Sequence, residues 1–127
     1  MRVGVAVDGR GKIAIAHCPR ASSFFARLRG LLGRDGVGEE TALLIDRCGS
    51  VHTVGMRFSL DLVFVDASWR VVRIFRGIPP GKMMVTGGWR ARRVYEIEAG
   101  RVPLSALGEG DLLEWREEVP AGGERTK

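Results

Sequence analysis

CGSVHTVGMRFSLDLVFVD, residues 48–66, is the stretch that decides the fold, because a polar segment leads directly into a strand interrupted only by Asp61. The residues from Phe58 to Val65 are apolar on both faces, which is expected of a strand at the centre of a sheet. A carboxylate in such a strand is costly to bury without hydrogen-bond donors or a cation. We therefore expect Asp61 to be paired, or to lie at a strand end.

Two kinds of environment are open to Asp61. The paired side chain could meet a cation from Arg57, Arg70 or Arg73, or accept hydrogen bonds from backbone amides of residues 48–56. Alternatively, the carboxylate faces a ligand, with polar residues of the preceding segment at one rim of a pocket. On that interpretation the candidate ligand-binding residues are His52, Thr53, Met56 and Asp61.

The rest of the chain reads mainly as short strands. Val3, Val5 and Val7 alternate with small residues and are followed, after an Asp-Gly turn, by Ile13 and Ile15, which predicts a hairpin with one buried face. Further strands are predicted at 41–45, 70–75, 94–98 and 112–115, and a loop at 77–88 whose Met83 and Met84 fold back onto the body.

One clear helix is predicted near the N-terminus. Apolar residues recur at helical spacing from Ser22 or Ser23 to Leu32, with a serine as N-cap and Gly33 to end the segment. A brief helical turn is expected at 103–107. Together these elements predict an α+β fold, mainly antiparallel β, in which a compact barrel or sandwich carries one packed α-helix near the N-terminus.

Size and composition indicate one globular domain. A chain of 127 residues with 45% hydrophobic residues forms a single core, so we predict one domain over 1–116 and a flexible polar tail at 117–127. The first residues lack the continuous apolar run of a signal peptide, which predicts a soluble cytoplasmic protein. A disulfide between Cys18 and Cys48 is disfavoured there. The absence of Asn and Gln favours a thermophilic source.

Positive charge is concentrated in the second half of this basic chain. The net charge is +5, and residues 67–101 hold eight cationic against two acidic side chains. If folding gathers these groups on one face, that face would attract polyanions, anionic ligands or an acidic partner. With aromatic residues interleaved for stacking, the candidate nucleic-acid-binding residues are Arg70, Arg73, Arg76, Arg90, Arg92 and Arg93. The alternative is a solvated arginine-rich face.

Cys48, His52 and Met56 recur at intervals of four. Thiolate and thioether ligands with imidazole suit Cu(I), and Cys with His suits zinc, so the three are candidate soft-metal ligands. The alternative is that Cys48 and Met56 pack inward while His52 makes a structural hydrogen bond. A histidine near Cys48 would also permit a nucleophilic thiolate, with Asp61 as its orienting partner. No catalytic motif is recognised, so binding is favoured over catalysis, and no cofactor is predicted.

Five short sequence motifs follow one another along the chain. They are RGLLGR (29–34), LLI (43–45), CGSVHTVGM followed by SLDLVFVD (48–66), RVYEIEAG (93–100) and LGEGDLLEW (107–115). Over roughly residues 17–116 the chain therefore resembles the bacterial and archaeal family called domain of unknown function 192 (DUF192). The resemblance implies a small, mostly β fold with one helix and no assigned catalytic residues.

The sequence thus predicts a cytoplasmic β-rich module that binds a small ligand or a protein partner and does not contact a membrane. Two other functions are kept open. One is single-stranded nucleic-acid binding through residues 67–101, and the other is copper or zinc binding through Cys48, His52 and Met56.

Overall fold

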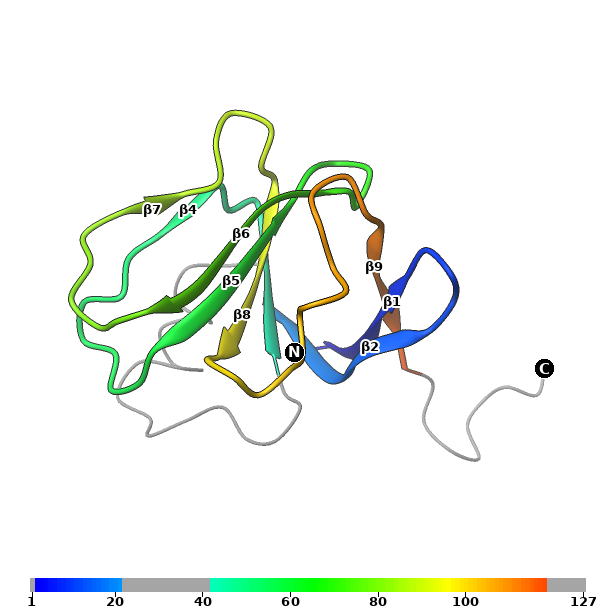
Figure 1. Ribbon diagram of the computed structural model, residues 1–127, viewed down its shortest axis with the longest axis horizontal. Helices are drawn as coiled ribbons and strands as arrows, with labels where there is room; N and C mark the ends of the chain where they lie inside the picture. The colour runs from blue at the N-terminus through cyan, green and yellow to red at the C-terminus, as the bar shows by residue number, and fades with distance from the viewer. Residues whose placement is uncertain (1, 22–41, 119–127) are drawn as a thin grey trace.

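Seven strands form one curled sheet, and two short strands pair separately (Figure 1). The computed structural model describes residues 2–21 and 42–118. Across the large sheet the order is β6 (Val71–Ile78), β5 (Leu60–Val65), β8 (Arg93–Glu98), β3 (Ala42–Asp46), β2 (Ile13–Ala21), β1 (Arg2–Asp8) and β9 (Leu113–Glu117). The small sheet consists of β4 (Ser50–Val51) and β7 (Val85–Thr86). All neighbouring strands are antiparallel except β2 and β3.

The sheet curls until its two edge strands approach each other. Arg70, just before β6, forms a β-bridge with Leu112, just before β9. Two backbone hydrogen bonds support this approach, from Val71 N–H to the Asp111 carbonyl at 2.8 Å and from Leu113 N–H to the Trp69 carbonyl at 2.9 Å. The result is a half-barrel that closes at one end.

β5 is the central strand that its apolar sequence predicted. It lies between β6 and β8, and all six of its residues are buried. Because side chains alternate across a strand, Val63 and Val65 face the interior of the curl, whereas Leu62 and Phe64 face the opposite side. β5 therefore has a separate hydrophobic cluster on each face.

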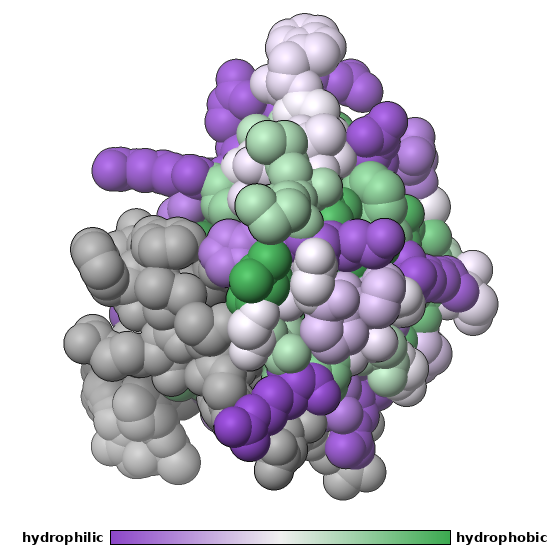
Figure 2. Space-filling model, turned by 90° about the vertical axis from the view of Figure 1, so that its left-hand side faces the viewer, coloured by the Kyte–Doolittle hydropathy of each residue, from purple (hydrophilic) through white to green (hydrophobic). Residues whose placement is uncertain are grey.

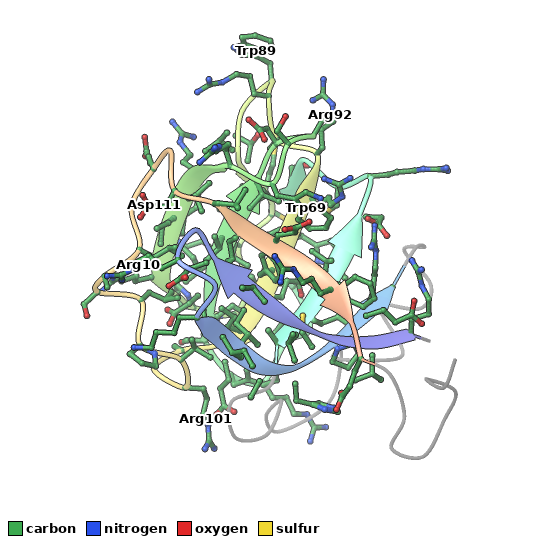
Figure 3. The ribbon with its side chains drawn as sticks, turned by 90° about the vertical axis from the view of Figure 1, so that its right-hand side faces the viewer. Arg10, Trp69, Trp89, Arg92, Arg101 and Asp111 are labelled. Carbon is green, nitrogen blue, oxygen red and sulfur yellow. The ribbon has the colours of Figure 1, made fainter. Side chains whose placement is uncertain are left out.

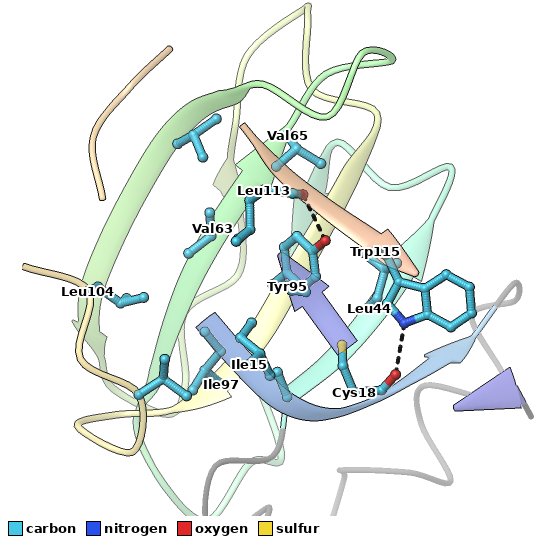
Figure 4. Close-up of a cluster of buried hydrophobic side chains, with 14 residues drawn as sticks. Ile15, Cys18, Leu44, Val63, Val65, Tyr95, Ile97, Leu104, Leu113 and Trp115 are labelled. Carbon is cyan, nitrogen blue, oxygen red and sulfur yellow. Dashed lines mark hydrogen bonds between the residues drawn. The ribbon is translucent and has the colours of Figure 1, made fainter. Parts of the chain in front are cut away.

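The inner cluster fills the curl and contains two buried polar atoms with partners (Figure 4). The Tyr95 hydroxyl donates to the Leu113 carbonyl at 2.9 Å, and the Trp115 indole Nε1–H donates to the Cys18 carbonyl at 2.9 Å. Paired in this way, the groups avoid the cost of an unsatisfied buried donor. Burial also raises the pKa of the Cys18 thiol to about 12, so this cysteine stays protonated at neutral pH.

The outer cluster lies between β5 and the small sheet. Met56, Phe58 and Phe64 pack there with Val51 of β4 and Val85 of β7. The contact between the layers is close, because a Cβ added at Gly87 would collide with the ring of Phe64. Glycine at this position lets the strand-to-loop backbone lie directly on the aromatic ring.

The expectation of an α+β fold with a packed helix is wrong. Residues 2–21 and 42–118 contain strands and no helix, so the described part of the fold is all-β. The helix predicted from Ser22 or Ser23 to Leu32 lies outside the described residues. At 103–107 the chain makes one turn, with Leu107 N–H bonded to the Leu104 carbonyl at 3.0 Å, and a separate turn from Gly108 to Asp111 follows it. No described helix has the length and apolarity needed to span a membrane.

The hairpin of β1 and β2 forms as predicted, and Val7 and Ile15 are buried as expected, but the rest of its buried face differs. Gly4 and Ala6 face the core, while Val3 and Val5 are half-buried and Ile13 is 55% exposed. The indole of Trp115 lies so close to Gly4 that an added Cβ would come within 2.6 Å of it. Small residues therefore take the inner face, because the space above them is filled by a tryptophan from β9.

The predicted boundaries at the end of the chain also shift. β9 runs to Glu117, one residue into the segment predicted as a tail, and pairs with β1. Residues 119–127 lie outside the described part of the chain.

Candidate functional site

Thr53 anchors the loop between β6 and β7. Its side chain is fully buried, and its hydroxyl donates to the Pro79 carbonyl at 2.7 Å while accepting from Lys82 N–H at 2.8 Å. Its backbone N–H donates to the Lys82 carbonyl at 2.8 Å, and its carbonyl accepts from Gly81 N–H at 2.9 Å. The polar groups of Thr53 are therefore engaged with a neighbouring turn of the same chain.

This anchoring leaves the two methionines after the turn outside the body. Met83 is 81% exposed and Met84 71% exposed, so they do not fold back as expected. The face that carries β4 and β7 accordingly shows apolar atoms among hydrophilic ones (Figure 2). The reason is steric, since Val51, Val85 and Phe58 already fill the space below the small sheet.

The three candidate soft-metal ligands occupy different environments. Met56 is buried in the outer cluster, while Cys48 is half-buried and its Sγ–H donates to the Ser50 carbonyl at 3.0 Å. His52 is half-buried. Within residues 2–21 and 42–118, no three His, Cys, Asp or Glu side chains are grouped as a metal site would require. Metal binding through Cys48, His52 and Met56 stays a prediction. No disulfide joins Cys18 and Cys48.

Asp61 is 5% exposed and binds backbone amides. Its two carboxylate oxygens accept from Gly77 N–H at 2.8 Å and from Gly100 N–H at 3.1 Å. These donors come from the end of β6 and the turn after β8, and neither an arginine nor residues 48–56 supply them. Asp61 thus ties together two segments that flank β5.

Asp61 and Met56 also lie on opposite sides of the sheet. Asp61 alternates with Leu60 and Leu62 along β5, and these two leucines share the outer cluster with Met56. Asp61 instead borders an open hollow of about 580 Å³ that includes Arg76 and residues 102–105. The four candidate ligand-binding residues therefore do not line one common pocket.

The candidate nucleic-acid-binding arginines are distributed over the molecule. Arg73 binds the Thr86 carbonyl at 3.1 Å, Arg76 borders the hollow beside Asp61, and Arg70 reaches the Gly110 carbonyl at 3.4 Å. Arg90 lies 6.0 Å from the centroid of the exposed Trp89 ring, and Arg92 donates to the Trp89 carbonyl. Six arginines that are close in sequence thus have different local contacts, and nucleic-acid binding through them stays a prediction.

Arg93 belongs to a half-buried ionic cluster. Its Nε lies 3.2 Å from Asp46, and its guanidinium lies 3.9 Å from the centroid of the Trp69 ring. Arg20 binds the same carboxylate through two hydrogen bonds, at 2.7 and 2.9 Å. Burial by itself raises the pKa of Asp46, but the two arginines outweigh it and hold the pKa below its ordinary value. This cluster joins β2, β3 and β8.

A cavity that the sequence did not reveal lies between the β1–β2 turn and the segment before β9. It encloses about 590 Å³. Buried Ile15, Leu104 and Leu113 contribute apolar walls, and Ile13 stands at the entrance. Polar residues of both segments line the same cavity, and Figure 3 shows Arg10 and Asp111 on the same side of the molecule. The charged lining residues are Asp8, Arg10, Lys12, Arg70 and Asp111.

The two carboxylates at this cavity are held by their own turns. Asp8 accepts from Arg10 N–H and Lys12 N–H, each at 2.9 Å, and Asp111 accepts from Gly108 N–H at 2.8 Å. The backbone hydrogen bonds from Lys12 and Arg10 lower the pKa of Asp8, which keeps this carboxylate ionised. In the described part of the chain, no carboxylate forms an ion pair with Arg10 or Lys12.

Sequence reasoning missed this cavity because its two sides are about ninety residues apart in the chain. The sequence predicts only a turn at the Asp-Gly-Arg-Gly segment, residues 8–11. The one local signal is that two cations, Arg10 and Lys12, precede an isoleucine that turns out to be exposed. Pairing of β9 with β1 brings Leu113 to the same cavity as Ile13 and Ile15, and the segment before β9 adds Leu104.

Comparison with known proteins finds a family whose model matches most of this chain. The family model DUF192, described as an uncharacterised ACR, matches residues 5–115. A curated relative named UPF0127 protein, from Thermococcus sibiricus, is 27% identical over 113 residues, covering 86% of this chain and 72% of its own.

Two solved structures share the fold. One is a protein of unknown function from Novosphingobium aromaticivorans, with a TM-score of 0.71 and 21% identity, covering 89% of this chain and 84% of its own. The other is a putative transcription regulator from Sinorhizobium meliloti, with a TM-score of 0.71 and 20% identity, covering 90% and 92%.

Proposed function

We propose that this protein, which belongs to the DUF192 family, binds a small amphiphilic anion, meaning a molecule with an apolar body and a negatively charged group. The observation that carries the proposal is the cavity of about 590 Å³ beside the β1–β2 turn. Small-molecule sites typically enclose roughly 300–1,000 Å³ and combine mostly apolar walls with a few polar groups. The size and lining of this cavity fit that description.

The apolar walls belong to the inner cluster and are therefore preformed. Ile15, Leu104 and Leu113 are each at most 5% exposed and pack against the rest of the core. A ligand body placed on them would also cover Ile13, which is 55% exposed in the free protein. Burying that side chain supplies a hydrophobic gain without requiring a rearrangement of the sheet.

The charged residues around the cavity favour an anion over a cation. Arg10, Lys12 and Arg70 supply three positive charges, whereas the carboxylates of Asp8 and Asp111 already accept hydrogen bonds within their turns. Arg10 and Lys12 are exposed at the turn, where their flexible side chains can reach a carboxylate, sulfonate or phosphate group. A cationic ligand would meet these groups instead and be repelled.

The test compares two dyes that differ in one charged group. 8-Anilinonaphthalene-1-sulfonate carries a sulfonate on an apolar body, and N-phenyl-1-naphthylamine has the same body without it. Fluorescence titration should show saturable binding of the sulfonate at one site, at least about fivefold tighter than the neutral dye. In the Arg10→Ala/Lys12→Ala double variant the two dyes should bind equally.

A second pair of variants tests the apolar walls. Ile13→Asp should weaken both dyes by tenfold or more, because it places a carboxylate at the cavity entrance. Val54→Asp is the matched control, since Val54 is also exposed, at 43%, but lies outside the cavity. Equal loss in the two variants, or equal affinity for both dyes in the unmodified protein, would disprove the proposed site.

A further inference from the structure

The loop between β7 and β8 holds a tryptophan away from the body. Trp89 is 84% exposed and stands at the tip of the molecule (Figure 3). The loop beneath it is ordered by its own hydrogen bonds, from Gly88 N–H to the Thr86 hydroxyl at 3.1 Å and from Ala91 N–H to the Gly88 carbonyl at 3.1 Å. Arg92 N–H then bonds the Val65 carbonyl at 2.8 Å, which fixes the loop to β5.

Arginines are held beside this indole. Arg92 Nη1 donates to the Trp89 carbonyl at 2.8 Å and to the Ala91 carbonyl at 3.2 Å. The guanidinium carbon of Arg90 lies 6.0 Å from the centroid of the Trp89 ring. Arg90 thus faces the exposed ring, while the hydrogen bonds of Arg92 hold its guanidinium against the backbone of the same loop.

Arg47 supplies a further cation on a segment that is hydrogen-bonded to this loop. Exposed Arg47 follows β3, and the next residue, Cys48, donates its N–H to the Arg92 carbonyl at 2.9 Å. Arg47 has a φ of 52°, in the left-handed region that turns the chain out of the strand. No acidic residue occurs from position 67 to position 95. Nearby Asp46 is bound to Arg20 and Arg93, and Asp66 Oδ1 to backbone amides.

We propose that this tip, formed by Trp89, Arg90 and Arg92, binds single-stranded nucleic acid. An unpaired base stacks on the Trp89 indole, and the phosphates on either side of it contact the arginines. An aromatic platform combined with cations is how many proteins bind single strands without reading their sequence. The tip is separate from the amphiphile cavity, so this inference does not depend on the proposed function.

The surroundings of Trp89 favour this partner over the other anionic surfaces. Insertion into a lipid bilayer requires several apolar side chains at one tip, but Trp89 is flanked by Gly88 and Arg90. The exposed Met83 and Met84 belong to the turn that Thr53 anchors. A duplex hides its base faces in the stack, so it cannot use the indole.

The experiment measures binding of a short fluorescein-labelled oligothymidylate by anisotropy across a salt series. Trp89→Ala should weaken binding roughly 5- to 150-fold, which is the loss of one base stacked on an aromatic ring. Trp89→Phe should retain part of the affinity. Arg92→Ala should weaken binding and reduce the slope of log affinity against log salt by about 0.7, as expected when one phosphate contact is lost.

Controls separate this site from general attraction to a basic protein. Arg101→Ala removes the same charge from the opposite end of the molecule (Figure 3) and should leave the salt slope unchanged. Heparin binding should not respond to Trp89→Ala, because heparin has no bases to stack. The proposal is overturned if the oligonucleotide fails to bind at low salt, if Trp89→Ala binds it normally, or if duplex DNA or anionic phosphatidylserine vesicles bind more tightly. Since Trp89 is exposed, urea denaturation should show the variant to be as stable as the unmodified protein.

Discussion

Two polar regions of the molecule differ in their exposure to solvent. Thr53 and Asp61 are almost inaccessible, whereas Arg10 and Lys12 at the cavity entrance are exposed. The first pair binds backbone groups of the loop after β6 and the turn after β8. The second pair lies on a hairpin turn whose backbone amides are already held by Asp8. Both regions are polar, but only the second has charged side chains available to a solute.

The difference follows from where each region lies relative to the core. A polar side chain inside an apolar strand must find partners when it is buried, and the nearest ones are backbone groups of adjacent turns. A cation on a hairpin turn remains hydrated and has no such requirement. Removing a polar group should therefore change stability in the first region and ligand binding in the second.

The largest effect is expected for Asp61→Ala. The variant removes both acceptors of the Gly77 and Gly100 amides, and each hydrogen bond to a charged group contributes about 1.5 kcal/mol or more. The free energy of unfolding from urea denaturation should therefore fall by about 3 kcal/mol. Asp61→Asn, which keeps the shape and one acceptor, should lose about half as much. Equal stability of all three proteins would show that Asp61 is not a structural tie.

Thr53→Val should follow with a loss of about 2 kcal/mol. The substitution keeps the shape of the side chain but leaves the Pro79 carbonyl and the Lys82 amide without the hydroxyl. Thr53→Ser retains the hydroxyl and removes one methyl group, which costs about 0.8 kcal/mol. The same urea measurement ranks the two variants, and a serine variant as unstable as the valine variant would contradict the role given to the hydroxyl.

Acid should weaken the ionic cluster around Asp46. Its folded-state pKa lies below the ordinary value of 3.8, so its contribution to stability is complete above that pH and is lost as pH falls through the lower folded value. Asp46→Asn should cost about 1.5 kcal/mol at pH 7 and flatten the decline of unfolding free energy below pH 4. Urea denaturation at pH 7 and pH 3 measures both. Glu117→Gln, on an exposed ion pair, should leave the acid slope unchanged.

The smallest effect on stability is expected for the Arg10→Ala/Lys12→Ala double variant. Its free energy of unfolding should change by less than about 0.5 kcal/mol, because neither side chain is buried. Loss of the preference for the sulfonate dye with unchanged stability would sharpen the contrast between the two regions. A large loss of stability would instead show that Arg10 and Lys12 stabilise the fold, as Thr53 and Asp61 are expected to do.

Much of the sheet was predictable from short-range patterns. The apolar run through Leu62 and Phe64 indicated a central strand, and the structure buries both of its faces. The need of Asp61 for donors was also evident, but their identity was not, because Gly77 and Gly100 become neighbours only through pairing with β6 and β8. Alternation correctly buried Val7 but not Val3 and Val5, since Trp115, more than a hundred residues away, lies over Gly4.

By itself, the sequence determined where most strands run and the family to which the chain belongs, since alternation, apolar runs and ordered motifs are local properties of the chain. Tertiary structure alone decided which polar groups remain accessible. Pairing of β9 with β1 places Leu113 beside the β1–β2 turn at the cavity, and the loop after β6 encloses Thr53. Accessibility depends on contacts between distant segments, and these contacts exist only once the sheet has closed.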